Sequence, residues 1–175
     1  MSRSERLLAV LAALVLCWTS ACSKSPTSDP AGTPGGVPEL PARYVLATAP
    51  ADAIGVRALR DAMPREGEVK VLGRVKDFVD GRAMFTIVDA SVPSCADRPG
   101  DNCTTPWDYC CEEPKSLARN TATVEFHGDD DAIVRARVKG VSGIDHLTRV
   151  VVVGKAVQDS AGNLTIRASG LGVQR

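Results

Sequence analysis

The chain is poor in aromatic residues and has no excess of charge of either sign. Aromatics make up 4% of its 175 residues, which provides little for a surface that stacks nucleic-acid bases. Lys and Arg together number 21, as do Asp and Glu, so no overall field attracts nucleic acid or an anionic membrane. No serine lies in a nucleophile-elbow pattern, and no glycine-rich loop could cradle a phosphate. We therefore expect a non-enzymatic protein that binds neither nucleotides nor nucleic acid.

The longest apolar run is also short. It spans Leu7 to Trp18, about a dozen residues, whereas a helix through a ~30 Å hydrocarbon core needs about 20. Two arginines precede this run, and the small residues 19–21 follow it, directly before Cys22. This arrangement resembles the lipobox of bacterial lipoproteins, and the resemblance implies a signal peptide over residues 1–21 and a lipid on Cys22. An ordinary secretory signal cut after Ala21 is the alternative.

Residues 22–42 are rich in Pro, Gly, Ser and Thr. Such a composition cannot bury enough apolar surface to order itself, so we expect a disordered tether after the lipidated cysteine. Once Cys17 leaves with the leader and Cys22 carries lipid, four cysteines remain, an even number that suits an oxidising compartment. We predict a protein anchored by its lipid to a bacterial membrane and facing the periplasm. The outer membrane is preferred, because Ser23 is not the Asp that retains some lipoproteins at the inner membrane. A protein or small-ligand partner is left unidentified.

Residues 43–67 are predicted to be a helical lead-in. The spacing favours one helix over residues 50–63, because Pro50 suits the first helical position and Pro64 forbids continuation. Three apolar residues share one face of that helix and are typical of core packing: Val56, Leu59 and Met63.

From Glu68 onward, apolar residues recur with the period of two that is typical of strands. Gly73 interrupts the first strand, at a position that often marks a bulge or a sharp bend. Asp80 and Gly81 close a hairpin, and one helical turn is expected over residues 142–147. The expected strands are 69–75, 82–89, 121–126, 133–138, 149–157 and 164–173.

This order of elements resembles the OB-fold, a small five-stranded Greek-key barrel. The Gly73-Arg74-Val75 run and the run from Phe85 to Asp89 are similar to patterns found in OB domains. The prediction is an all-β domain with minor helix over residues 68–175, with a cysteine-rich insertion between its second and third strands. A plain β-sandwich is the alternative.

Several short runs also resemble a family of uncharacterised bacterial lipoproteins of planctomycete type. The most specific is Thr105 to Glu112, TPWDYCCE, because Trp and paired Cys are rare residues. The others are residues 81–83, 85–89 and 162–164. The resemblance implies a shared address and fold, and no activity comes with it.

The insertion, over residues 91–117, needs something to hold it together, because loops of this length without structure are uncommon in small domains. It contains Cys95, Cys103, Cys110 and Cys111. Two disulfides are the first possibility, as small exported domains often use them. Since adjacent Cys110 and Cys111 are poorly placed to pair, the bridges would be 95–110 with 103–111, or 95–111 with 103–110. Each would contribute on the order of 3 kcal/mol.

The same four thiols could instead bind Zn or Cu, with His127 or Asp108 as a further ligand. Their spacing lacks the closely spaced cysteine pairs of common zinc sites. Thiol redox chemistry is a third possibility, although there is no C-x-x-C motif and no apparent helix N-terminus to lower a thiol pKa. We predict a disulfide-bonded loop in a non-enzymatic binding or structural module. Metal binding or thiol redox chemistry is the alternative.

Trp107, Asp108 and Tyr109 form the candidate binding surface, because OB barrels often bind ligands beside their second and third strands. Whether the two rings face a partner or cover the cysteines is left open. Residues 129–131, all Asp, are interpreted as an acidic turn, since they lack the spacing of a calcium loop. His127 and His146 are predicted to be surface residues.

Overall fold

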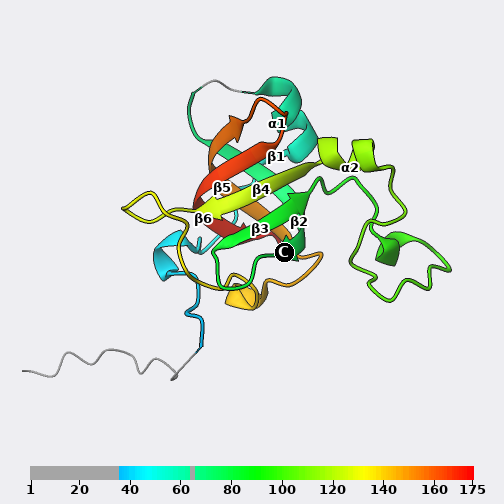
Figure 1. Cartoon of the computed structure of the whole chain (residues 1–175), viewed down its shortest axis with the longest axis horizontal. Coiled ribbons are helices and arrows are strands. Elements are labelled where there is room, and N and C mark those ends of the chain that lie inside the picture. The colour runs from blue at the N-terminus through cyan, green and yellow to red at the C-terminus, as the bar shows by residue number, and fades with distance from the viewer. Residues whose placement is uncertain (1–35, 64–65) are drawn as a thin grey trace, which may run out of the picture. The chain divides into compact units, whose positions relative to one another are not determined.

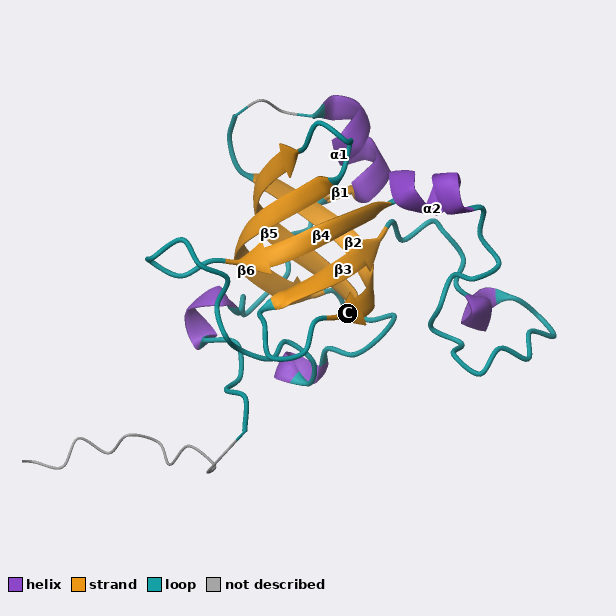
Figure 2. Cartoon of the chain, in the orientation of Figure 1, coloured by secondary structure: helices purple, strands orange, loops and turns teal. Residues whose placement is uncertain are grey.

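The chain folds into a closed β-barrel with short helices around it and a long loop on one side (Figures 1 and 2). The computed structural model describes residues 36–63 and 66–175, so the expected signal peptide and Cys22 lie outside the described residues. Among the described residues, no helix has the length and apolar character needed to cross a membrane.

Five strands make up the barrel. β2, β3 and β4 form an antiparallel meander, β4 pairs in parallel with β6, and β6 pairs with β5. β5 then pairs with β2 and closes the barrel. Each strand therefore has a partner on both sides, which confirms the predicted OB-like Greek-key barrel and excludes the β-sandwich. The bounds are β2 Val69–Phe78, β3 Met84–Val88, β4 Thr121–Phe126, β5 Arg149–Gln158 and β6 Leu164–Val173.

The barrel core follows from the two-residue period of the strands. From Val69 to Lys76, buried positions alternate with half-buried ones. A Cβ on Gly73 would lie 2.9 Å from Ile87 Cβ, so two neighbouring strands approach there too closely for a side chain. The register shift between β2 and β3 lies further on, between Val75 and Phe78. Every barrel strand contributes to the interior, with Val71, Phe85, Val124, Val152 and Ile166 among the fully buried residues.

The lead-in is helical over a shorter stretch than predicted. α1 spans Val56–Ala62, and β1, Ile54–Gly55, precedes it. The expected helix over 50–63 is therefore wrong in its first half, because residues 54 and 55 pair in parallel with β2 instead. The predicted apolar face is confirmed: Val56 and Leu59 are fully buried and Met63 packs against the core.

Residues 133–138 do not form the expected strand. Ile133 and Arg137 each make only an isolated bridge. The backbone groups of this segment have partners in different parts of the chain: Val134 O accepts from Ala83 N–H, and Arg137 O accepts from Leu40 N–H. Because a strand needs one neighbour along its length, this segment is an irregular connection.

Two short 3-10 helices precede β1 and β5 in the chain. η1, Ala42–Tyr44, follows the buried Leu40, so the last residues of the expected tether contact the barrel core. The helical turn predicted over 142–147 is wrong over most of its length. The 3-10 turn η3 covers Val141–Gly143 instead, and Ser142 within it adopts a left-handed φ of 50°.

The insertion connects β3 to β4 and occupies residues 89–120, at the right of Figure 1. It contains η2, Cys95–Asp97, and α2, Pro114–Arg119, a helix that the sequence pattern did not predict. The Glu113 side chain caps α2 by accepting the N–H groups of residues 115 and 116. Arg60 of α1 donates to Ala118 O and Thr121 O, which anchors the far end of the insertion to the domain.

Candidate metal centre in the cysteine insertion

The insertion begins at a buried carboxylate that fixes its direction. Asp89 accepts hydrogen bonds from Arg57 N–H at 3.0 Å and from the backbone and hydroxyl of Ser91 at 3.0 and 2.7 Å. Burial opposes ionisation of Asp89, but these hydrogen bonds hold its pKa below the ordinary value. The first residues of the loop are therefore held against α1 and the end of β3.

A second carboxylate attaches η2 to the barrel. Asp97 accepts hydrogen bonds from the N–H and hydroxyl of Ser94, both at 2.8 Å, in a capping box. Arg74 on β2 pairs with the same carboxylate. The Arg74 hydrogen bond, followed by that of the Ser94 N–H, lowers the pKa of Asp97 to about 2. Cys95, the first residue of η2, thereby takes a defined place beside β2.

Backbone hydrogen bonds then bring the two sides of the loop together. Cys95 N–H donates to Asp108 O at 2.9 Å, and Ala96 N–H donates to Pro106 O at 2.7 Å. The two acceptor residues belong to one tight turn, in which Asp108 N–H donates to Thr105 O. This pairing places Cys110 opposite Cys95, although the two are 15 residues apart in the sequence.

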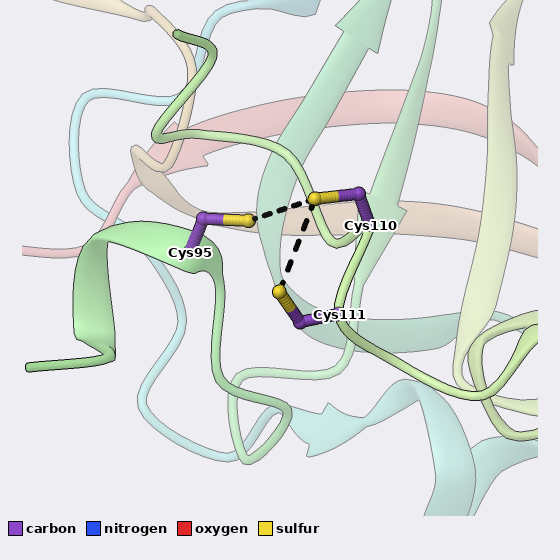
Figure 3. A group of neighbouring side chains, drawn as sticks. All are labelled: Cys95, Cys110 and Cys111. Carbon is purple, nitrogen blue, oxygen red and sulfur yellow. Dashed lines mark hydrogen bonds between the residues drawn. The ribbon is translucent and has the colours of Figure 1, made fainter. Parts of the chain in front are cut away.

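Three loop cysteines gather around the sulfur of the fourth, Cys110. Figure 3 shows Cys110 with two of them, Cys95 and Cys111. Cys110 Sγ lies 3.4 Å from Cys95 Sγ, 3.8 Å from Cys103 Sγ and 4.0 Å from Cys111 Sγ. Cys95 is buried, Cys103 is half-buried, and the other two are exposed. All four are free thiols within the part of the chain that the structure describes.

These distances suit ligands of a metal ion. Zn–S bonds of about 2.3 Å place the sulfurs of a tetrahedral site about 3.8 Å apart, whereas a disulfide holds them at about 2.05 Å. Cys95, Cys110 and Cys111 have donor atoms that all lie within 4.8 Å of one another. A second such group consists of Cys95, Cys103 and Asp101. The cysteine groups of the insertion could therefore hold a metal ion.

The thiols differ in acidity because of the same contacts. Hydrogen bonding with Cys95, Cys103 and Cys111 raises the pKa of Cys110 to about 12. Burial raises the pKa of Cys95. The Thr105 hydroxyl, 3.5 Å from Cys103 Sγ, and the neighbouring Cys110 thiol lower the pKa of Cys103. The Cys103 thiol is thus more acidic than those of Cys95 and Cys110.

The two aromatic rings of the expected binding surface face in different directions. Trp107 is 36% exposed and stacks on His146, with ring centroids 4.9 Å apart. Tyr109 is only 1% exposed and packs with Val88 and Val92 in a small core beneath the insertion. The Tyr109 hydroxyl is buried without a hydrogen-bond partner among the described residues. The prediction of a surface made of both rings is accordingly reduced to Trp107.

The other predicted ligands point elsewhere. Asp108 accepts from the N–H of Tyr109 and lies 3.7 Å from Lys76 Nζ, toward the barrel. His127 Nε2 is hydrogen-bonded to Glu125 Oε2, at 2.9 Å, on the outside of β4. Both histidines were predicted to lie at the surface, and both are half-buried. His146 stacks against Trp107, and its Nδ1–H donates to Lys76 O.

Asp101 is the site residue that sequence reasoning missed. Its Oδ1 accepts from Cys103 N–H at 2.7 Å, the local bond that an Asp two residues before a Cys commonly makes. That D-x-C spacing was visible in the sequence, but it does not reveal which way the second carboxylate oxygen faces. The acidic residues 129–131 form a turn as predicted, with Asp131 paired to Arg167.

A cavity of about 770 Å³ lies away from the cysteines, between residues 42–51 and the end of β6. Arg175 is the one charged side chain in its lining, so it offers little for acid–base or metal chemistry. The resemblance of residues 105–112 to envelope lipoproteins stays a prediction. No family model matches this chain, and no curated protein is similar to it.

Proposed function

We propose that the protein is a non-enzymatic metal-binding module of the bacterial envelope. In this proposal the expected lipid on Cys22 anchors it, and the cysteine insertion displays a site for a thiophilic ion beside an OB-like barrel. The observation that carries the proposal is the packing of three sulfurs around Cys110 Sγ at 3.4 to 4.0 Å.

That packing favours a metal over disulfides because of how many neighbours each can use. A disulfide would join Cys110 to only one of its three close sulfurs, and the other two would have to pair with each other. A metal ion engages several sulfurs at once, at separations near the about 3.8 Å of a tetrahedral thiolate site. Soft thiolate ligands select Zn²⁺ or Cu⁺ in preference to Mg²⁺ or Ca²⁺. Cys95, Cys110 and Cys111 are the first set of ligands, and they leave further positions open.

Protons must leave as the metal binds. Cys110, with a pKa of about 12, is a thiol at neutral pH, and the ligand form is the thiolate. Metal binding therefore releases protons, and affinity rises as pH rises toward that pKa. A site of this kind binds more weakly in acid, which a titration at pH 6 and pH 8 would detect as a difference of at least tenfold.

The metal would also organise the surface next to it. Cys103 and Cys110 lie on either side of the turn that presents Trp107. Cys95, on the far side of the same turn, shares the proposed ligand set with Cys110, so one ion bound to both restrains the turn and keeps the Trp107 ring stacked on His146. Binding free energy then appears as folding free energy of the insertion.

The test uses the full chain, purified in detergent under reducing and anaerobic conditions. Elemental analysis and thiol counting by mass spectrometry are expected to give bound zinc or copper and four unoxidised loop thiols. Cys110→Ser should weaken binding at least tenfold, whereas Cys22→Ser, which removes a cysteine outside the loop, should retain the metal. Four oxidised loop cysteines without metal would overturn the proposal in favour of a disulfide-bonded module.

A further inference from the structure

The cysteine insertion contains a second group of donor atoms that shares only Cys95 with the first. Cys95 Sγ, Cys103 Sγ and a carboxylate oxygen of Asp101 all lie within 4.8 Å of one another. Cys110 and Cys111 complete the first group on the other side of Cys95. Cys95 is the buried member of both groups, so it is the sulfur best shielded from water.

Asp101 is held so that its free oxygen faces sulfur. Oδ1 accepts from Cys103 N–H at 2.7 Å, which fixes the carboxylate plane beside the Cys103 side chain. Oδ2 lies 3.9 Å from Cys111 Sγ. The carboxylate thus lies against sulfurs from both donor groups, and the structure gives it no ion pair with a described residue.

The charge of the donors also favours a second cation. One divalent ion on the thiolates of Cys95, Cys110 and Cys111 leaves one negative charge on that group, and the Asp101 carboxylate adds a second close to it while Cys103 keeps its proton. Arg98 is the nearby guanidinium, and it is already paired with Glu112. A second divalent ion reduces the excess to one negative charge, and close like charges of this kind are costly when left uncompensated.

We propose that the insertion binds two zinc ions that share the Cys95 thiolate. One ion is held by Cys95, Cys110 and Cys111, and the other by Cys95, Cys103 and Asp101. This inference rests on the proposed metal-binding function and specifies its metal and stoichiometry. Zinc suits the second site because it accepts carboxylate oxygen together with sulfur, whereas Cu⁺ favours sulfur alone.

The experiment titrates the metal-free, reduced full chain with Zn²⁺ in competition with a chromophoric chelator, and native mass spectrometry counts the bound ions. The wild type should bind two ions. Asp101→Asn keeps an acceptor for Cys103 N–H but loses the charge, so it should bind one ion, with the second at least tenfold weaker. Asp108→Asn is the matched control from the same loop and should still bind two.

The outcomes separate this inference from the proposed function. One ion in the wild type and no change in Asp101→Asn overturns the second site but leaves a metal-binding module. Two ions in both the wild type and Asp101→Asn overturns the role given to Asp101. No bound zinc, with all four thiols reduced, overturns the two-zinc inference, and a parallel titration with Cu⁺ that also gives no bound ion overturns the proposed function as well.

Discussion

Replacing Tyr109 by Phe should stabilise the protein, although Tyr109 is among its most buried side chains. Its hydroxyl lies in the small core beneath the insertion and has no hydrogen-bond partner among the described residues. Burying an unpaired hydroxyl costs about 1–3 kcal/mol, so removing it is favourable. The void left by the missing oxygen is destabilising and offsets part of that gain. We therefore expect Tyr109→Phe to raise the free energy of unfolding by about 1 kcal/mol.

Tyr44 provides the matched comparison, because it is a second buried tyrosine whose hydroxyl is fully engaged. That hydroxyl donates to His127 O at 2.8 Å and accepts from Arg43 at 3.0 Å. Tyr44→Phe removes both bonds and leaves a carbonyl without its donor, at a cost of about 1 kcal/mol. The two variants should therefore differ by about 2 kcal/mol, or about 8 °C in melting temperature at about 4 °C per kcal/mol.

The assay is equilibrium urea unfolding followed by far-UV circular dichroism, with zinc held at the same saturating level for both variants, since bound metal adds stability of its own. A loss of 1 kcal/mol or more in Tyr109→Phe would refute the reasoning. It would mean that the Tyr109 hydroxyl has a hydrogen-bond partner in solution.

Two other substitutions test how the insertion is attached. Asp97→Asn should lower stability at pH 7 by less than about 1 kcal/mol, because the ion pair with Arg74 is partly exposed. The pKa of Asp97 is depressed to about 2, so its contribution is present above the ordinary value of 3.8 and disappears as pH falls through 2. Urea midpoints of wild type and variant should accordingly converge near pH 2, and a gap that persists there would contradict the assignment. Trp107→Ala should cost about 1 kcal/mol through loss of the stack on His146 and weaken association with a partner, with the barrel circular dichroism spectrum unchanged. Global unfolding of that variant would show that the ring belongs to the core.

The barrel was predictable because its strands carry their own pattern. The alternation along Val69–Lys76 specifies which face of β2 is buried, and the unbroken valine run at 150–153 indicates burial on both faces of β5. Residues 133–138 have a similar apolar content, but their backbone partners come from three separate segments. No local pattern encodes such an arrangement, and a strand was wrongly expected there.

The four cysteines of the candidate site were predictable, but Asp101 and the geometry of the site were not. The sequence favoured disulfides and left metal binding as an alternative, because the position of Cys110 among the other sulfurs depends on hydrogen bonds between residues 95–96 and 106–108. The inward face of Tyr109 and the outward face of Trp107 follow from the same pairing. α2 was missed because it is six residues long, too short for a periodic signal to emerge, even with Pro114 at its start.

The contrast between local and distant contacts in this fold also bears on how the molecule matures. The sulfurs of Cys95 and Cys110 come together across 15 residues of sequence. The parallel pairing of β4 with β6 joins more distant residues, such as Thr123 and Thr165. The barrel closes only when β5 pairs with β2. Short loops form far sooner than long ones, so the thiols of an emerging chain would come together while the last two strands are still unpaired. If the insertion is the metal centre proposed above, a metal ion and an oxidant would compete for these thiols before the barrel has closed, and the order of their arrival would set the form that the folded protein keeps.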